Sequence, residues 1–312
     1  MSLFLGIDTS NYTTSCAVYN DQTDEMVMRK NLLNVKSGEV GLRQSEAVFQ
    51  HVVNLPRLMD QLPVDRAHIA SVCASSRPRS VDGSYMPCFN VGMGSAKQIA
   101  HCLNVPFYEQ SHQNGHVAAA LYSAGQTGLF QRSFIAFHVS GGTTEALLVS
   151  PDDKELIRCE LIARSLDLKA GQAIDRVGVA LGLDFPCGGE LDLLARSSVA
   201  GFRIRPALKG NDCCLSGVQN KCEQMINEGC PREDVALYCI LYIKETLSQM
   251  TGRLLDKYGE IPLVFAGGVM CNSMIKKEFS ERFGAFFAQP QYSSDNAAGI
   301  AYLGFLKHKN RS

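Results

Sequence analysis

Hydrophobic positions along the chain alternate between short runs rich in β-branched and aromatic residues and longer stretches with helical spacing. This alternation is typical of an α/β fold. It predicts strands at 3–7, 15–19, 69–74, 105–109, 134–139, 146–150 and 263–266. It predicts helices at 47–62, 94–103, 112–123, 161–183 and 233–258, and one that begins at Ser273.

One local pattern occurs twice, as a strand, a tight polar turn and a returning strand. The two copies read LFLGIDTSNYTTSCAVY and FIAFHVSGGTTEALLVS, so we expect two homologous halves. Each turn, at 8–14 and at 140–144, offers small residues, hydroxyls and backbone N–H groups, as a phosphate cradle requires. An ordinary β-turn has the same composition, so a single loop leaves both interpretations open, whereas two facing loops can grip one nucleotide.

Composition narrows the class of protein. The 312 residues are 46% hydrophobic and 20% charged, which excludes general disorder and allows two domains or one duplicated domain. The net charge of −1 excludes binding to nucleic acid by bulk charge alone. Basic residues cluster at Arg77/Arg79, within 203–209 and in the C-terminal LKHKNR. Contacts with a phosphate backbone and ordinary solvated faces explain these clusters equally well.

Targeting signals and disulfides are not expected. No apolar run reaches the roughly 18 residues of a membrane helix, and MSLFLGIDTS has neither the basic n-region nor the small-residue cleavage site of a secretion signal. The twelve cysteines show no C-x-x-C spacing, so we expect reduced thiols and a cytoplasmic protein.

His112 and His116 form an H-x-x-x-H pair in a predicted helix. Residues four apart share one helix face, so both imidazoles can reach one metal ion. A solvent-facing or core pair is the alternative. A zinc peptidase would need a glutamate directly after the first histidine, and Gln113 cannot take up a proton.

Further polar candidates follow predicted strands or lie in helices. His138 precedes the turn of Val139, Ser140, Gly141 and Gly142, and either faces a pocket or packs in the core.

Three more side chains have two interpretations each. Asn272, after AGGVMC, either holds a base or sugar edge or belongs to an ordinary strand-to-helix turn. Asp175 either binds a ribose hydroxyl or pairs with Arg176 or Lys169. Asp295 is either a third metal ligand or the N-cap of the last helix.

These motifs, in order and spacing, resemble the Gcp/TsaD/Qri-type tRNA N6-adenosine threonylcarbamoyltransferases, a family once thought to be glycoproteases. The resemblance extends from Leu3 to about Leu306. It rests on GIDTS, H-x-x-x-H, VSGG, GQAIDRVGVALGLDFPCGG, LSGVQNK, AGGVMCN and SSDNAAGIA.

The resemblance implies an actin-like ATPase fold, with two RNase H-like subdomains and the nucleotide and metal sites between them. We expect one subdomain at 1–125 and the other at 126–295, with the helix 296–312 packed back on the first. It implies a divalent metal, Fe or Zn, held by His112, His116 and Asp295. Positions matching the family's nucleotide contacts are His138, Val139, Ser140, Gly141, Gly142, Asp175, Gly188 and Asn272.

The implied reaction moves a threonylcarbamoyl group from its AMP anhydride to the exocyclic nitrogen of an adenosine in tRNA. The nucleophile belongs to the tRNA, so the protein mainly positions the reactants. The implied cofactors are the metal ion and an adenine nucleotide, threonylcarbamoyl-AMP or ATP. The implied partners are tRNA and accessory protein subunits or a homologous dimer partner.

Several positions depart from the family pattern. Tyr12 and Thr13 replace an acidic pair after the first strand, and Asn114 replaces the glutamate of H-x-E-G-H. Thr143 replaces the histidine after VSGG, and the family's PGPG loop is here RPRS from Arg77. The chain therefore resembles a divergent paralogue, for which a regulatory or scaffolding subunit that binds nucleotide and metal is the alternative function.

Overall fold

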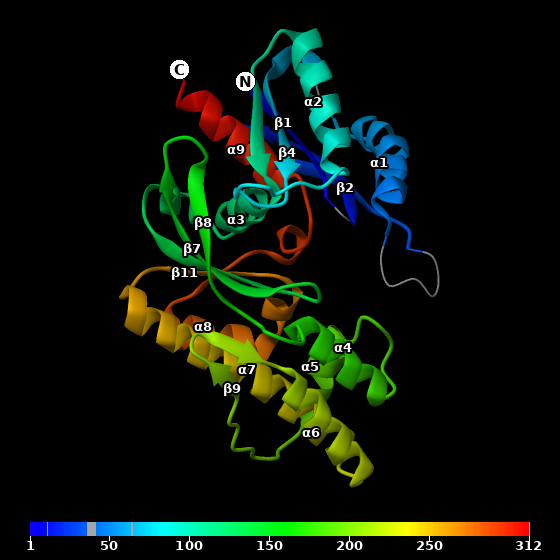
Figure 1. Cartoon of the computed structure of the whole chain (residues 1–312), viewed down its shortest axis with the longest axis vertical. Coiled ribbons are helices and arrows are strands. Elements are labelled where there is room, and N and C mark those ends of the chain that lie inside the picture. The colour runs from blue at the N-terminus through cyan, green and yellow to red at the C-terminus, as the bar shows by residue number, and fades with distance from the viewer. Residues whose placement is uncertain (11, 36–41, 64, 312) are drawn as a thin grey trace. The chain divides into compact units, whose positions relative to one another are not determined.

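The computed structural model of the chain describes residues 1–10, 12–35, 42–63 and 65–311. It divides into two compact units, each with its own five-stranded sheet (Figure 1). The first unit comprises Met1–Arg132, Ser150–Cys159 and Gln291–Ser312, and the second comprises Ser133–Val149 and Glu160–Pro290.

The sheet of the first unit has the strand order β3-β2-β1-β4-β5. The strands are β1 (Leu3–Thr9), β2 (Thr13–Asn20), β3 (Glu25–Leu32), β4 (Ile69–Arg77) and β5 (Phe107–Ser111). Strand β1 is antiparallel to β2 and parallel to β4, and it is buried along its whole length. A strand buried on both faces needs helices on both, which this unit supplies.

Four helices cover this sheet: α1 (Gln44–Met59), α2 (Phe89–Leu103), α3 (His112–Ser123) and α9 (Ala298–Lys309). Side chains of a strand alternate between faces. Leu5 and Ile7 therefore pack in a cluster with residues of α1 and α2. Phe4 points the other way and contacts Phe305 of α9, with ring centroids 5.1 Å apart. Asp8 shares this second face, the one that α9 covers.

Helices α3 and α9 pack at backbone contact. A Cβ atom on Gly299 of α9 would lie 1.8 Å from the carbonyl oxygen of Gly115 and 2.7 Å from the amide nitrogen of Ala119, both in α3. Only glycine fits at such a distance. This contact fixes the start of α9 beside the start of α3.

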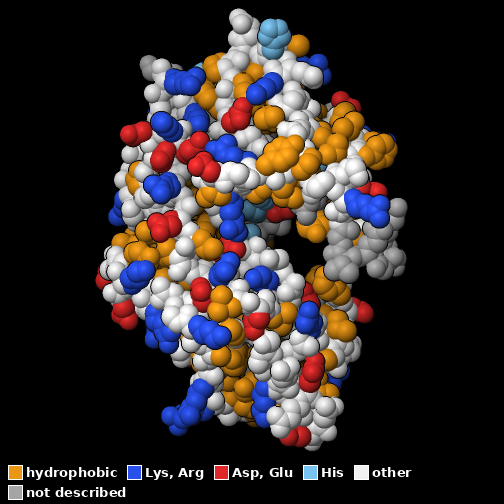
Figure 2. Space-filling model, viewed as in Figure 1, with side chains coloured by type: hydrophobic (Ala, Val, Ile, Leu, Met, Phe, Trp, Pro, Cys, Tyr) orange, Lys and Arg blue, Asp and Glu red, His pale blue; other side chains and the backbone are white. Residues whose placement is uncertain are grey.

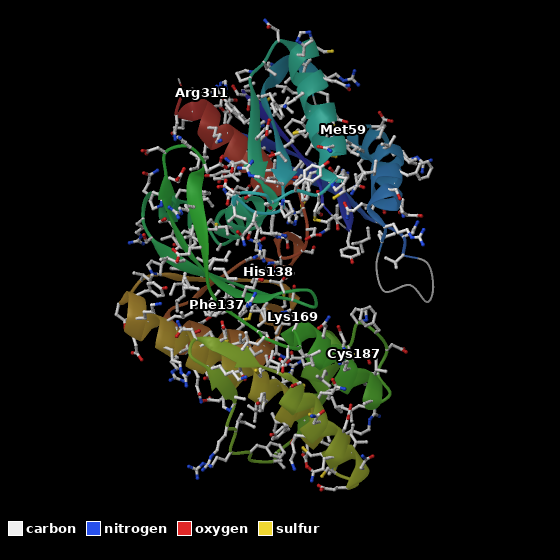
Figure 3. The ribbon with its side chains drawn as sticks, viewed as in Figure 1. Met59, Phe137, His138, Lys169, Cys187 and Arg311 are labelled. Carbon is white, nitrogen blue, oxygen red and sulfur yellow. The ribbon has the colours of Figure 1, made fainter. Side chains whose placement is uncertain are left out.

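The sheet of the second unit has the order β12-β11-β6-β7-β8. Its strands are β6 (Phe134–Val139), β7 (Thr144–Asp152), β8 (Leu156–Arg164), β11 (Leu263–Ala266) and β12 (Phe286–Phe287). Phe137 of β6, labelled in Figure 3, stacks on Phe265 of the neighbouring strand β11, with ring centroids 4.6 Å apart, and both belong to the buried core of this unit.

Five helices and a small hairpin complete this unit. They are α4 (Ala170–Ala180), α5 (Gly188–Ser197), β9 (Ala207–Lys209), β10 (Asp212–Cys214), α6 (Ser216–Asn227), α7 (Arg232–Tyr258) and α8 (Ser273–Phe283).

Most predicted elements are confirmed, with several at the same residues, including the strands at 134–139 and 263–266 and the helix at 112–123. The helix predicted at 161–183 is wrong, because its first residues belong to the edge strand β8 and α4 begins only at Ala170. The pattern missed β3, α5 and α6, which expose much of their surface and so carry few buried apolar residues. The predicted turn at 8–14 is shorter than expected, and its Asn11 lies outside the described residues.

Three further observations concern membrane-spanning helices, the thiols and the surface charges. Among the described residues, no helix has the length and apolar character needed to cross a membrane. All twelve cysteines are free. Acidic and basic side chains are interspersed on the face drawn in Figure 2, in keeping with the net charge of −1.

Candidate metal centre and nucleotide pocket

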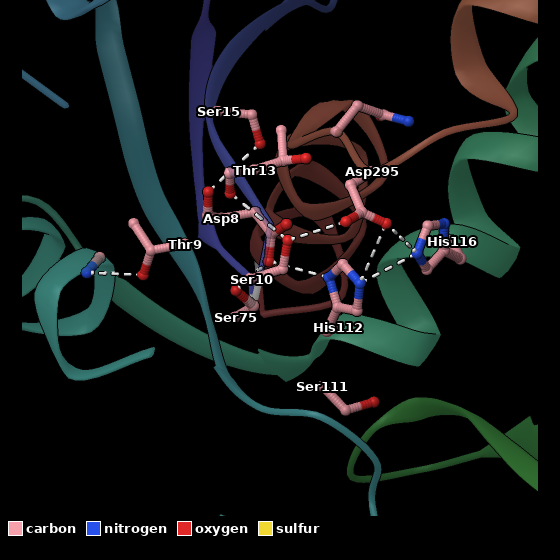
Figure 4. A network of polar contacts seen from close by, with 12 residues as sticks. Asp8, Thr9, Ser10, Thr13, Ser15, Ser75, Ser111, His112, His116 and Asp295 are labelled. Carbon is pink, nitrogen blue, oxygen red and sulfur yellow. Dashed lines mark hydrogen bonds and ion pairs between the residues drawn. The ribbon is translucent and has the colours of Figure 1, made fainter. Parts of the chain in front are cut away.

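Two of the first unit's histidines, His112 and His116, lie in the first turns of α3. Ser111 caps this helix by accepting a hydrogen bond from the Asn114 N–H at 3.1 Å, and His112 follows directly. The Nε2 atoms of His112 and His116 lie 2.9 Å apart, so both rings present the same nitrogen to one point (Figure 4).

Asp295 joins this pair from the segment before α9. Its Oδ1 lies 3.1 Å from His116 Nε2 and 3.6 Å from His112 Nε2. One ligand atom from each of the three residues lies within 4.8 Å of the others. Ala297 is the N-cap residue of α9, and Asn296 rather than Asp295 accepts a hydrogen bond from the Ala298 N–H, at 3.0 Å. Asp295 therefore does not cap the helix, and its carboxylate faces the two imidazoles.

A second carboxylate, Asp8, lies behind His112. It is fully buried at the end of β1, accepts from the Ser75 hydroxyl, and lies 3.0 Å from His112 Nδ1. This contact leaves His112 Nε2 facing His116 and Asp295, as in the carboxylate–histidine arrangement of many metal sites. The other oxygen of Asp8 is buried without a hydrogen-bond partner in the described structure.

The charges of this cluster shift its pKa values strongly. Burial alone would lower the pKa of His112, but the charge of Asp8 and the hydrogen bonds that the imidazole donates to Asp295 and Asp8 raise it to about 10. Burial would raise the pKa of Asp295, yet hydrogen bonds from His112 and His116 hold it well below its usual range. Two carboxylates facing two imidazoles make a site with excess negative charge. The donor set of two nitrogens and an oxygen fits a divalent ion such as Fe or Zn.

The positions that depart from the family pattern lie around this cluster in different ways. Asn114 is buried on the opposite side of α3, where its amide donates to Gln110 and to the Ile157 carbonyl. Its replacement of a glutamate therefore does not alter the three ligand atoms. Tyr12 is 42% exposed, and Thr13 is buried beside Ser10.

Spacing in the sequence did not point to Asp8 or His51, which support the cluster. His51 of α1 is buried between the Thr14 hydroxyl and the Ser10 carbonyl, each at 2.8 Å. The Ser10 hydroxyl in turn donates to Asp295 Oδ2 at 3.2 Å. An acidic residue at the end of a fully apolar strand was the available signal for Asp8.

The second unit contains a pocket of about 330 Å³, within the range of small-molecule sites. Of the predicted nucleotide contacts, Gly141, Asp175, Gly188 and Asn272 line it.

The other predicted contacts shape the turn beside this pocket. Ser140 closes the turn by donating its N–H to the Thr143 carbonyl at 2.7 Å, and its own carbonyl accepts from Gly171. Val139 is buried, Gly142 is exposed, and His138 is half-buried on β6 (Figure 3).

Hydrogen bonds within the chain hold Asp175 and the two basic side chains near it in place. Asp175 accepts from the Cys187 N–H at 3.0 Å, while Arg176 donates to Gln219 and Lys169 to the Ser165 carbonyl. Figure 3 marks Lys169 and Cys187 next to α4 and α5.

Asp192, which the motifs did not indicate, also lines the pocket. Asn272 caps α8 with its amide oxygen and donates its NH₂ to Asp192 at 2.8 Å. The Asp192 carboxylate is therefore held in place at the wall of the pocket.

The sequence matches the profile of TsaD, tRNA N6-adenosine threonylcarbamoyltransferase, over residues 37–302. The chain belongs to the TsaD family. A TsaD relative from Kosmotoga olearia, itself named tRNA N6-adenosine threonylcarbamoyltransferase, is 29% identical over 98% of this chain and 93% of its own length. The family resemblance found in the motifs is thereby confirmed.

Solved structures support the predicted actin-like ATPase fold for this TsaD-family chain. Component A of the (R)-2-hydroxyglutaryl-CoA dehydratase from Acidaminococcus fermentans is similar, with a TM-score of 0.58 and 16% identity over 99% of this chain and 100% of that one. Full-length HypF gives a TM-score of 0.60 and 13% identity over 99% of this chain and 55% of that one. The predicted actin-like ATPase fold is confirmed.

Proposed function

We propose that this TsaD-family chain transfers a threonylcarbamoyl group from threonylcarbamoyl-AMP to adenosine in tRNA. The observation that carries the proposal is the convergence of His112, His116 and Asp295, with Asp8 behind His112, in a chain of this family. The residues would hold a divalent ion, which when bound supplies Lewis-acid polarisation of the acyl carbonyl or carboxylate.

Each group of residues has a distinct task in this proposal. Asp8 keeps the Nδ1 proton of His112 in place, so that Nε2 is free to act as a ligand. Ser10 holds the second oxygen of Asp295. The pocket of the second unit, with Asp175, Asp192 and the VSGG turn, would hold the adenylate that leaves. The attacking nitrogen comes from the tRNA, so no protein nucleophile is required.

Partners and location follow from the same proposal. Phe49 and Val52 are 66% and 55% exposed one turn apart on α1, which suits an accessory subunit. Twelve free cysteines suit the cytoplasm, where tRNA is modified. Gln113, next to His112, cannot act as the general base of a peptidase.

Mass spectrometry of tRNA nucleosides tests the proposed function. The purified chain, with its metal content measured, is added to an extract that lacks its own transferase, with threonine, bicarbonate and ATP. We expect threonylcarbamoyladenosine to appear in the tRNA. A metal-loaded chain that forms no modified nucleoside, with any accessory subunits of the extract present, would contradict the transferase and favour the scaffolding function.

The nucleotide pocket is tested by Gly171→Ala. A Cβ there would lie 2.5 Å from the Gly141 amide nitrogen and would push the VSGG turn out of place. Overpacking of this size costs about 1–3 kcal/mol, so we expect AMP binding in calorimetry to weaken by about tenfold or more.

Gly252→Ala is the matched control for this variant. Gly252 also lies in a helix of the second unit, but nothing lies within 4 Å of its added Cβ. We expect unchanged AMP affinity and a stability gain of up to about 1 kcal/mol. Equal AMP affinity in Gly171→Ala and the wild type would show that the VSGG turn is not part of the nucleotide site.

A further inference from the structure

A row of polar residues crosses the sheet of the first unit at the level of Asp8. Asp8 pairs with Ser15 across β1 and β2, and Ser15 pairs with Lys30 across β2 and β3. Residues directly opposite in neighbouring strands place their side chains on the same face. Lys30 therefore projects on the same face as Asp8, the carboxylate that contacts His112.

Lys30 also reaches the segment that carries the third ligand. Its Nζ donates to the Ser294 hydroxyl at 2.7 Å, and Ser294 immediately precedes Asp295. Burial lowers the pKa of this lysine, and the charge of Asp295 acts in the opposite direction. Lys30 and Ser294 are both exposed, so the ammonium and the hydroxyl remain open to a ligand.

With a divalent ion in the proposed site, the positive charge of Lys30 is not balanced by the charges of the cluster. Two neutral imidazoles, Asp295 and Asp8 together offset the two positive charges of a divalent ion. Lys30 then adds one positive charge at the edge of a neutral site. Such a point charge next to a hydroxyl donor suits an oxyanion.

We propose that Lys30 and Ser294 form an anion subsite beside the metal centre, which binds the carboxylate of the acyl group to be transferred. The inference rests on the proposed transfer function, because the threonylcarbamoyl group carries a free carboxylate. A nucleotide phosphate has the same oxyanion chemistry and is distinguished by experiment.

Calorimetry on the Co²⁺-loaded full chain tests the subsite, with N-carbamoyl-L-threonine as the carboxylate probe. Its methyl ester and inorganic phosphate serve as comparison ligands. For Lys30→Met we expect the affinity for the carboxylate probe to fall about tenfold, since hydrogen bonds to charged groups contribute about 1.5–3 kcal/mol. Lys30→Arg should recover part of this loss. The methyl ester should bind weakly to the wild type and to Lys30→Met alike.

The affinity for Co²⁺ separates this role from a structural one. Removing a positive charge near the ion should leave Co²⁺ binding unchanged or tighter. A lysine that merely orders the Asp295 segment would instead weaken Co²⁺ binding when replaced. Lys97→Met is the matched control, because Lys97 lies on α2 of the same unit and pairs with Glu109 at 3.2 Å.

Several results would overturn the subsite. Equal carboxylate affinity in Lys30→Met and the wild type, or no carboxylate binding by the wild type, excludes it. If Lys30→Met loses affinity for Co²⁺ and for the carboxylate probe together, Lys30 has a structural role. If the variant loses affinity for phosphate alone, Lys30 belongs to the nucleotide site. Carboxylate binding that depends on Lys30 in a chain forming no threonylcarbamoyladenosine would keep the subsite and reject the transfer function.

Discussion

Replacing His112 by alanine is expected to remove the bound metal and to lower threonylcarbamoyl transfer by about 10³-fold or more. Lewis-acid polarisation contributes several kcal/mol, and each 1.36 kcal/mol corresponds to a factor of ten in rate. The variant deletes one of the three proposed ligands and leaves Asp8 buried without its histidine. Elemental analysis gives the metal content, and nucleoside mass spectrometry gives the rate.

Two further variants make this result interpretable. His101→Ala removes an exposed histidine of α2 in the same unit and should keep both metal and activity. His116→Ala removes a proposed ligand whose Nε2 contacts Asp295, without directly exposing the charge of Asp8. A folded His112→Ala or His116→Ala chain that keeps full metal content and transfer would show that these histidines are not ligands.

Gly299→Ala is expected to destabilise the first unit by about 3 kcal/mol and to abolish metal binding. The added Cβ would overlap the Gly115 carbonyl, which lies between His112 and His116 in the sequence. Backbone cannot move aside as a side chain does, so α9 must shift and carry Asp295 away from the histidines. We expect a fall in melting temperature of roughly 6–12 °C, measured by circular dichroism.

Gly94→Ala provides the comparison within the same unit. Gly94 lies inside α2, and its added Cβ would meet nothing within 4 Å. Its replacement should leave metal binding intact and raise stability by up to about 1 kcal/mol. Normal metal affinity in Gly299→Ala would mean that the position of Asp295 does not depend on the contact between α3 and α9.

The elements that sequence predicts well are those with a local signal. Apolar runs located β6 and β11, and the spacing of His112 and His116 placed both on one face of α3. The edge strand β8 was not predicted because it precedes the helix α4. The prediction extended the helical spacing of α4 back into the strand.

Contacts between distant segments could not be obtained in this way. Asp295 had two interpretations, and only the contact of α9 with α3 brings it to the histidines. Asp8 and Lys30 are related through the register of three strands, which a single sequence does not specify. The sequence suggested that Asn114 replaces a carboxylate at the site, yet its buried amide donates a hydrogen bond that joins α3 to β8.

The order in which the first unit is completed along the chain has a consequence for its biosynthesis. The ribosome makes both histidines early, but Asp295 and α9 come after the whole of the second unit. The three residues of the proposed metal site therefore cannot meet in a nascent chain until Gln291–Ser312 has been synthesised. We expect uptake of the proposed metal only after translation has passed the second unit, and truncated products without the ion.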